Sequence, residues 1–258
     1  MTRLLGVDGC RGGWCAAPIE ANGTRLRLLE PVIYRSFEEV LASDAELICI
    51  DMPIGLLDRP GQRASDLEAR RLLGRRRAAV FPPPSRGALG ARSYKDACAI
   101  NLQITGRRIS LQAYNIAAKI REVDESMKPV YQNRVLEAHP ELCFAAVNQG
   151  RPLADSKKKQ VGQSARWALL RTVLPELPPE RRLPPSLRPT WPHRAPPGVT
   201  RGAPIAATCG LDDYMDALAC AWTAACVVRG IAARVPSVAE KDESGLRMEI
   251  WYPRTSAR

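Results

Sequence analysis

Three aspartates stand in a segment that is otherwise apolar nearly all round. They are Asp212, Asp213 and Asp216, in the helix that the pattern predicts over Leu211–Arg229. Burying an ionised carboxylate is costly unless it is paired or binds a metal. Negative charge in a first helical turn would also account for Asp212 and Asp213, but it does not account for Asp216. Because Asp213 and Asp216 project from one helical face, the segment predicts a cation site.

Further acidic residues end predicted strands. Asp8 follows Leu4–Val7, Asp51 follows Leu47–Ile50, and Glu137 follows 134–136. Strand ends are where α/β sheets build their sites, although an aspartate there can also merely shape a turn. Carboxylates that converge from two strands and a helix would bind Mg²⁺ or Mn²⁺ through oxygen. Two such ions about 4 Å apart can activate water for phosphodiester hydrolysis.

The elements that must position these carboxylates follow from periodicity and turn residues. A β-hairpin is predicted from Leu4–Val7 and Trp14–Ile19, joined by a glycine-rich turn. The remaining expected elements are strands at Arg25–Tyr34, Leu47–Ile50, Val135–Val147 and Leu246–Tyr252, and helices at Ser36–Ala42, Ser164–Leu174 and Leu211–Arg229. If the strand over Val135–Val147 runs unbroken past Pro140, Glu137 and Glu141 share a face, and which of them points inward stays open.

Two segments interrupt this pattern. Residues 59–128 are expected to form a mainly helical insertion, with helices at Ser65–Leu73, Tyr94–Ile104 and Leu111–Met127. Residues 175–204 are so rich in proline that we expect an extended excursion. The chain is otherwise predicted to be one domain over residues 1–258.

The motifs together resemble the domain of unknown function 429 family, whose members are described as predicted RNase H-like nucleases. The resemblance is carried by Gly6–Trp14, by Ile50–Leu56, by Glu137–Glu141 and by Asp212–Ala219. Single residues at Arg63, Asp66, Arg70, Lys119, Lys158, Gly162 and Arg166 also match. The spacing of Asp213 and Asp216 is similar to that in the closing helix of RuvC-type resolvases.

This resemblance implies an RNase H-like fold, a mixed five-stranded sheet that begins with three antiparallel strands and is flanked by helices. It implies that Asp8 bridges the metal ions, that Asp51 or Glu137 adds a ligand, and that Asp213 and Asp216 close the site. Lys119 would then be a catalytic residue, and Arg63, Arg70 and Arg11 would bind the phosphates of the substrate, although each is also explained as an ordinary solvated charge.

Composition limits the partners and the location. The net charge of +11 favours an anionic partner such as nucleic acid, although arginine enrichment can be a compositional bias. Eight cysteines without a C-x-x-C pair indicate buried thiols in a reducing compartment. The absence of a long apolar run predicts no membrane span, and the chain start lacks a signal-peptide core, so we expect a cytoplasmic protein. A homodimer is compatible with the sequence.

The predicted function is therefore a divalent-metal-dependent nuclease that hydrolyses phosphodiester bonds with metal-activated water. One alternative is a nucleotide phosphotransferase of the actin-like and sugar-kinase type. That class needs a second glycine-rich phosphate loop, and Asp51–Gly55 is a poor one. The other alternative is a catalytically inactive RNase H-like binding module.

Overall fold

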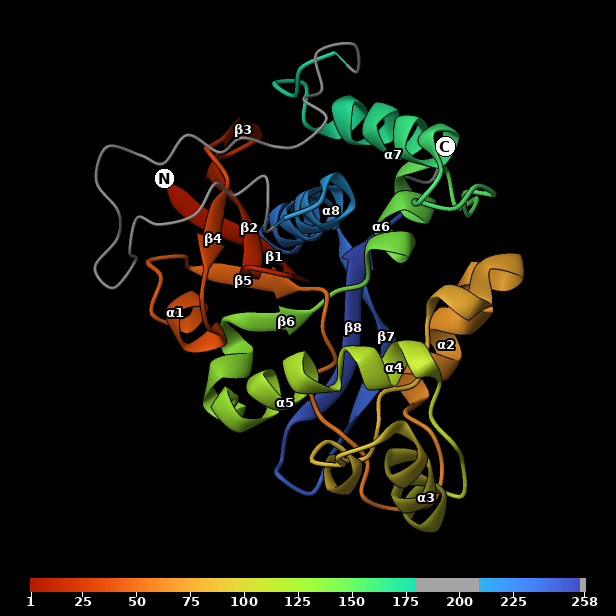
Figure 1. Cartoon of the computed structure of the whole chain (residues 1–258). Helices are drawn as coiled ribbons and strands as arrows, with labels where there is room; N and C mark the ends of the chain where they lie inside the picture. Colours follow the sequence, from red (N-terminus) through yellow and green to blue (C-terminus); the bar gives the residue numbers. More distant parts are fainter. Residues whose placement is uncertain (180–208, 256–258) are drawn as a thin grey trace. The chain divides into compact units, whose positions relative to one another are not determined.

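The computed structural model describes residues 1–179 and 209–255 (Figure 1). Most of the proline-rich segment predicted over 175–204 therefore lies outside the described residues. Among the helices of the described ranges, none has both the length and the apolar character needed to cross a membrane.

A mixed sheet forms the centre of the fold. Its strands are β1 (Thr2–Cys10), β2 (Gly13–Asn22), β3 (Arg25–Leu28), β4 (Val32–Tyr34), β5 (Leu47–Ile50) and β6 (Val135–Glu137). The order is β3-β2-β1-β5-β6, and β4 also pairs with β2. β2 runs antiparallel to β1, β3 and β4, whereas β5 runs parallel to β1. The mixed directions and the opening antiparallel strands confirm the predicted RNase H-like fold.

The sheet has six strands where five were expected. The single strand predicted over Arg25–Tyr34 is divided into β3 and β4, and Pro31 lies between them. Proline has no N–H to donate to a neighbouring strand, so the ladder is interrupted there. Both pieces still pair with β2.

Helices α6 (Pro140–Val147), α7 (Gln160–Val173) and α8 (Leu211–Val228) accompany this sheet, and α1 (Phe37–Leu41) begins after the N-cap Ser36. The prediction of one strand over Val135–Val147 is wrong, because β6 ends at Glu137 and α6 begins at Pro140. Proline is favourable at the first helical position, where its missing N–H would be unpaired in any case. Glu137 and Glu141 therefore do not share a strand face.

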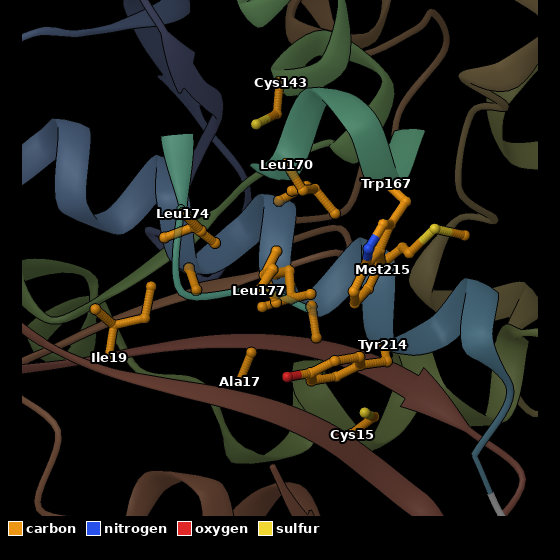
Figure 2. Close-up of a cluster of buried hydrophobic side chains, with 14 of the residues drawn as sticks. Cys15, Ala17, Ile19, Cys143, Trp167, Leu170, Leu174, Leu177, Tyr214 and Met215 are labelled. Carbon is orange, nitrogen blue, oxygen red and sulfur yellow. The ribbon is translucent and has the colours of Figure 1, made fainter. Parts of the chain in front are cut away.

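A hydrophobic core lies between β2, α7 and α8 (Figure 2). Ala17 and Ile19 of β2 meet Trp167 and Leu170 of α7 and Met215 of α8, and all five are buried. Burial of a large apolar side chain such as that of Ile19, Leu170 or Met215 contributes about 1.5–3 kcal/mol to the free energy of unfolding. This core fixes α8 against the sheet, and with it the aspartates that the helix carries.

The chain divides into two compact units. The first unit contains Met1–Asp51, Ala138–Ala233 and Tyr252–Arg258, and the second contains Met52–Glu137 and Arg234–Trp251. The second unit holds α2 (Ala64–Leu73), α3 (Tyr94–Thr105), α4 (Leu111–Asn115), α5 (Ala117–Ser126) and three 3₁₀ turns. It also includes most of a two-stranded sheet of β7 (Ala232–Lys241) and β8 (Arg247–Pro253), of which only β8 is anticipated by the sequence.

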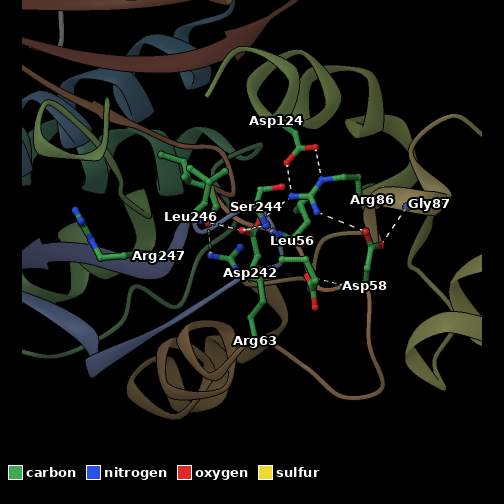
Figure 3. Close-up of polar contacts among 12 residues, drawn as sticks. Leu56, Asp58, Arg63, Arg86, Gly87, Asp124, Asp242, Ser244, Leu246 and Arg247 are labelled. Atoms are coloured by element: carbon green, nitrogen blue, oxygen red, sulfur yellow. Dashed lines mark hydrogen bonds and ion pairs between the residues drawn. The ribbon is translucent and has the colours of Figure 1, made fainter. Parts of the chain in front are cut away.

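Inside the second unit, Asp242 ties the β7–β8 turn to the rest of that unit (Figure 3). Its carboxylate accepts hydrogen bonds from the backbone N–H groups of Leu56 at 3.1 Å and of Leu246 at 2.9 Å. Arg86 donates to the same carboxylate at 2.6 Å and forms a two-pronged pair with Asp124. These contacts fix the β7–β8 turn to the segments that carry Leu56 and Arg86.

Candidate metal centre

Asp8 and Asp51 lie side by side because of the strand register. β1 and β5 are parallel with Val7 opposite Ile50, and each aspartate is the next residue in its strand direction. The backbone N–H of Asp51 extends the ladder by donating to the carbonyl oxygen of Val7 at 2.9 Å. The parallel register, with Asp8 inside β1 and Asp51 directly after β5, therefore places these acids together.

Asp216 reaches the same place from α8. Gly6 and Asp8 share one face of β1, because side chains alternate along a strand. A Cβ atom on Gly6 would overlap the backbone of Ala217 and Ala221, so α8 lies directly on β1 at this glycine. One ligand oxygen from each of Asp8, Asp51 and Asp216 lies within 4.8 Å of those of the other two.

Asp8 and Asp216 are buried, whereas Asp51 is partly exposed. Asp8 is 8% exposed and Asp216 is 2% exposed. Burial raises the pKa of Asp8 well above its ordinary value, and the neighbouring Asp51 and Asp216 raise it further. Burial likewise raises the pKa of Asp51 to about 6 and that of Asp216 to about 7, although Lys157 opposes both shifts. A cluster of acids whose ionised forms are disfavoured gains stability from any cation that it binds.

Lys157 is the cation that the chain itself supplies. Its ammonium group makes an ion pair with Asp216. It precedes α7 in a loop, and the pKa of this lysine is raised by Asp216, Asp8 and Asp51 in spite of its burial. Lys157 is absent from the predicted site residues because it is one of three consecutive lysines, and nothing in that run distinguishes it.

Asp213 lies one helical turn before Asp216 and has a second task. Its carboxylate accepts a hydrogen bond from the backbone N–H of Gly210 at 2.9 Å, which forms the capping box of α8. The structure therefore shows the first-turn role considered for this residue. Its part as a metal ligand stays a prediction, and the group of three carboxylates does not include it.

Glu137 and Glu141 are each paired with a buried arginine. In the second unit, Glu137 makes an ion pair with Arg63 and accepts from the backbone N–H of Ile54 at 2.7 Å. In the first unit, Glu141 accepts from Arg166 at 2.5 Å. Burial raises the pKa of Glu137 to about 7 in spite of Arg63. Neither glutamate belongs to the group of three carboxylates.

Three of the four residues predicted to contact phosphate have partners within the chain. Arg63 is 2% exposed and also lies 3.7 Å from Asp66. Arg70 donates to the carbonyl oxygen of Val80 at 2.5 Å, and Lys119 lies 3.3 Å from Glu122. Arg11 is exposed in the turn between β1 and β2. Contacts of these four side chains with a substrate stay predictions.

Fold and site together define a class: an RNase H-like α/β protein with a buried acidic cluster where β1, β5 and α8 meet. The chain belongs to the family described as protein of unknown function (DUF429), which it matches over residues 6–241. Among solved structures it is similar to T. thermophilus RuvC in complex with a Holliday junction substrate. That similarity has 14% sequence identity and a TM-score of 0.34, and it covers 89% of this chain and 96% of the other. No curated protein matches the chain.

Proposed function

We propose that the protein is a nuclease that depends on Mg²⁺ or Mn²⁺ and hydrolyses phosphodiester bonds of nucleic acid. The main observation behind this proposal is that Asp8, Asp51 and Asp216 lie together, with ligand oxygens within 4.8 Å of one another. The family resemblance adds the reaction class, and the net charge of +11 favours a polyanionic substrate.

The three residues fit such an ion. Carboxylate oxygens are the ligands that hard divalent cations prefer, and Mg²⁺ is usually held by few carboxylates. Opposite oxygens around Mg²⁺ are about 4.2 Å apart, so separations up to 4.8 Å need only small side-chain movements. Burial raises the pKa of Asp51 to about 6 and that of Asp216 to about 7, so a bound cation would favour the ionised forms.

A bound divalent ion would activate water and neutralise charge on the phosphate. The chain's own contribution is to hold the ligands rigidly before substrate arrives. Asp8 and Asp51 come from adjacent strands in fixed register, and Asp216 comes from a helix packed on one of those strands. Burial of the carboxylates limits their contact with bulk water, so their charge acts in a medium of low dielectric constant.

A phosphotransferase would need phosphate loops at the β1–β2 turn and at Asp51–Gly55. Gly13 and Gly55 in these segments have packing roles instead, so this alternative is less supported. Gly55 adopts a positive φ of 81° within the second unit, where a Cβ would press on Met248. Gly13, in the β1–β2 hairpin, has its Cβ position filled by the carbonyl oxygen of Tyr34. These positions favour glycine for packing inside the chain, whereas a phosphate cradle needs open backbone N–H groups.

The test is incubation with Mn²⁺ and three substrates: structured DNA, single strands and RNA/DNA hybrids. We expect cleavage by the wild type, and a loss of at least a hundredfold in Asp8→Asn and Asp216→Asn, because each removes a ligand charge. Asp212→Asn is the matched control, since it neutralises a carboxylate of the same helix outside the group of three.

Each other outcome has a definite meaning. Cleavage that survives both ligand substitutions would reject the metal centre. ATP turnover without cleavage would favour the phosphotransferase. Stabilisation of the wild type by Mn²⁺ without cleavage of any substrate would favour the inactive binding module.

A further inference from the structure

Lys157 occupies a position from which one ammonium group acts on all three carboxylates of the candidate centre. It makes an ion pair with Asp216, and its charge also acts on Asp8 and Asp51. The side chain of Lys157 is 35% exposed, whereas that of Asp216 is 3% exposed. The side chain of Lys157 therefore extends from a partly exposed loop position to a buried carboxylate.

The loop that carries Lys157 is anchored on both sides of this residue. Arg166 of α7 is fully buried and donates to the carbonyl oxygen of Asp155 at 3.0 Å and to that of Gly162 at 2.9 Å. A Cβ on Gly162 would overlap the carbonyl group of Ser156, so the loop lies close against the first turn of α7. Lys157 is held in place by these neighbours, and its ion pair is a property of the fold.

The charge balance of the three grouped carboxylates and Lys157 favours one number of divalent ions over another. Three ionised carboxylates carry −3, and with Lys157 the group carries −2, which one divalent ion balances. A pair of divalent ions would bring +4 against this −2. The nearby Glu141 is paired with Arg166, and this pair carries no net charge.

We propose that the centre holds one divalent ion per chain and that the ammonium group of Lys157 supplies the second positive charge. In a two-metal site the second positive charge comes from a second metal ion. The contact of Lys157 with a substrate phosphate rests on the proposed nuclease function, whereas the number of ions does not. Lys157 is thus assigned as the second cation of the centre, in place of a second metal ion.

The experiment counts Mn²⁺ ions bound to the full-length protein by calorimetric titration and by electron paramagnetic resonance. We expect one ion per wild-type chain and the spectrum of an isolated Mn²⁺. Lys157→Gln should bind that ion about tenfold more tightly, because repulsion between the ammonium group and the metal is removed. Lys157→Arg should restore the wild-type affinity, because it restores the charge.

The matched control is Lys159→Gln, which removes an exposed charge near Lys157 and should leave affinity and ion number unchanged. Two coupled ions in the wild type would overturn the inference even if cleavage is observed. Unchanged affinity in Lys157→Gln would also overturn it. One ion without cleavage would reject the nuclease and leave the inference standing. If Lys157→Gln fails to fold, the resonance spectrum of the wild type alone decides the number of ions.

Discussion

Gly6 of β1 lies directly against Ala217 of α8, so closely that a Cβ on the glycine would overlap the helix backbone. Asp8 follows on the same face of β1, and Asp216 directly precedes Ala217 in the helix. The contact between a glycine and an alanine therefore sets the separation between two carboxylates that belong to distant parts of the sequence.

Gly6→Ala should move α8 away from β1. We expect it to lower the free energy of unfolding by about 1–3 kcal/mol, as overpacking usually does, and to weaken stabilisation by Mn²⁺. Urea denaturation with and without Mn²⁺ measures both effects. Gly90→Ala is the control, because a Cβ on Gly90 meets nothing within 4 Å. Equal Mn²⁺ stabilisation of the wild type and Gly6→Ala would contradict the role given to this contact.

The parts of the site that the sequence predicts are those with local patterns. The apolar strands before Asp8 and Asp51 are predicted, and the helical placement of Asp216 follows from its apolar surroundings, whereas the parallel register of β1 and β5 comes from the structure. Lys157 could not be predicted, because the position of a loop lysine depends on tertiary contacts such as those of Arg166. The sequence predicts that Pro140 interrupts a strand, whereas in the structure it begins α6.

The sequence does not predict the pairing of Glu137 with Arg63 either, because the two residues lie 74 positions apart and both match the family motifs. A motif indicates that a residue type matters at a position. Only the tertiary structure shows whether a carboxylate there faces a guanidinium group or a metal.

The stability of the metal-free protein should depend on the ionisation of Asp51. Its pKa is raised to about 6 in the folded protein, first by burial, from an ordinary value of about 3.9. The folded state thus binds the proton more tightly than the unfolded state does. The resulting stabilisation is fully present below about pH 4 and is lost as the pH rises through about 6.

Asp51→Asn removes this titration. Relative to the wild type, we expect the variant to gain about 2 kcal/mol between pH 4 and pH 8 in the presence of a chelator. Urea denaturation at each pH gives the difference. Excess Mn²⁺ at pH 8 should reverse the order, because the ion stabilises only the ionised wild-type site. A difference that does not change with pH would show that Asp51 keeps an ordinary pKa.

Asp242→Ala should destabilise the second unit. The side chain is fully buried, and its loss leaves the backbone N–H groups of Leu56, Ser244 and Leu246 without their acceptor. We expect a loss of about 3–5 kcal/mol, measured by urea denaturation. Asp58→Ala removes a longer and more exposed contact with Arg86, at 3.5 Å, and should cost less than about 1 kcal/mol. Similar losses in the two variants would refute the central role of Asp242.

The pairing of Glu137 with Arg63 permits a test of whether this glutamate is a metal ligand. Arg63→Met leaves Glu137 and Asp66 without the guanidinium group that faces them, and we expect a loss of about 3–5 kcal/mol. Adding Glu137→Leu to Arg63→Met should recover part of that loss, because it removes one of the two carboxylates that faced the guanidinium group. Both values come from urea denaturation with a chelator present.

Glu137→Gln separates a role as hydrogen-bond acceptor from a role as metal ligand. Glutamine can still accept from Arg63 and from the N–H of Ile54, but it carries no charge. Because the carboxylate of Glu137 is already engaged by these two donors, we expect the variant to keep the full thermal stabilisation by Mn²⁺. Asp51→Asn, measured beside it, should lose that stabilisation. If Glu137→Gln loses it as well, Glu137 is a ligand, and its bond to Arg63 must open when the ion binds.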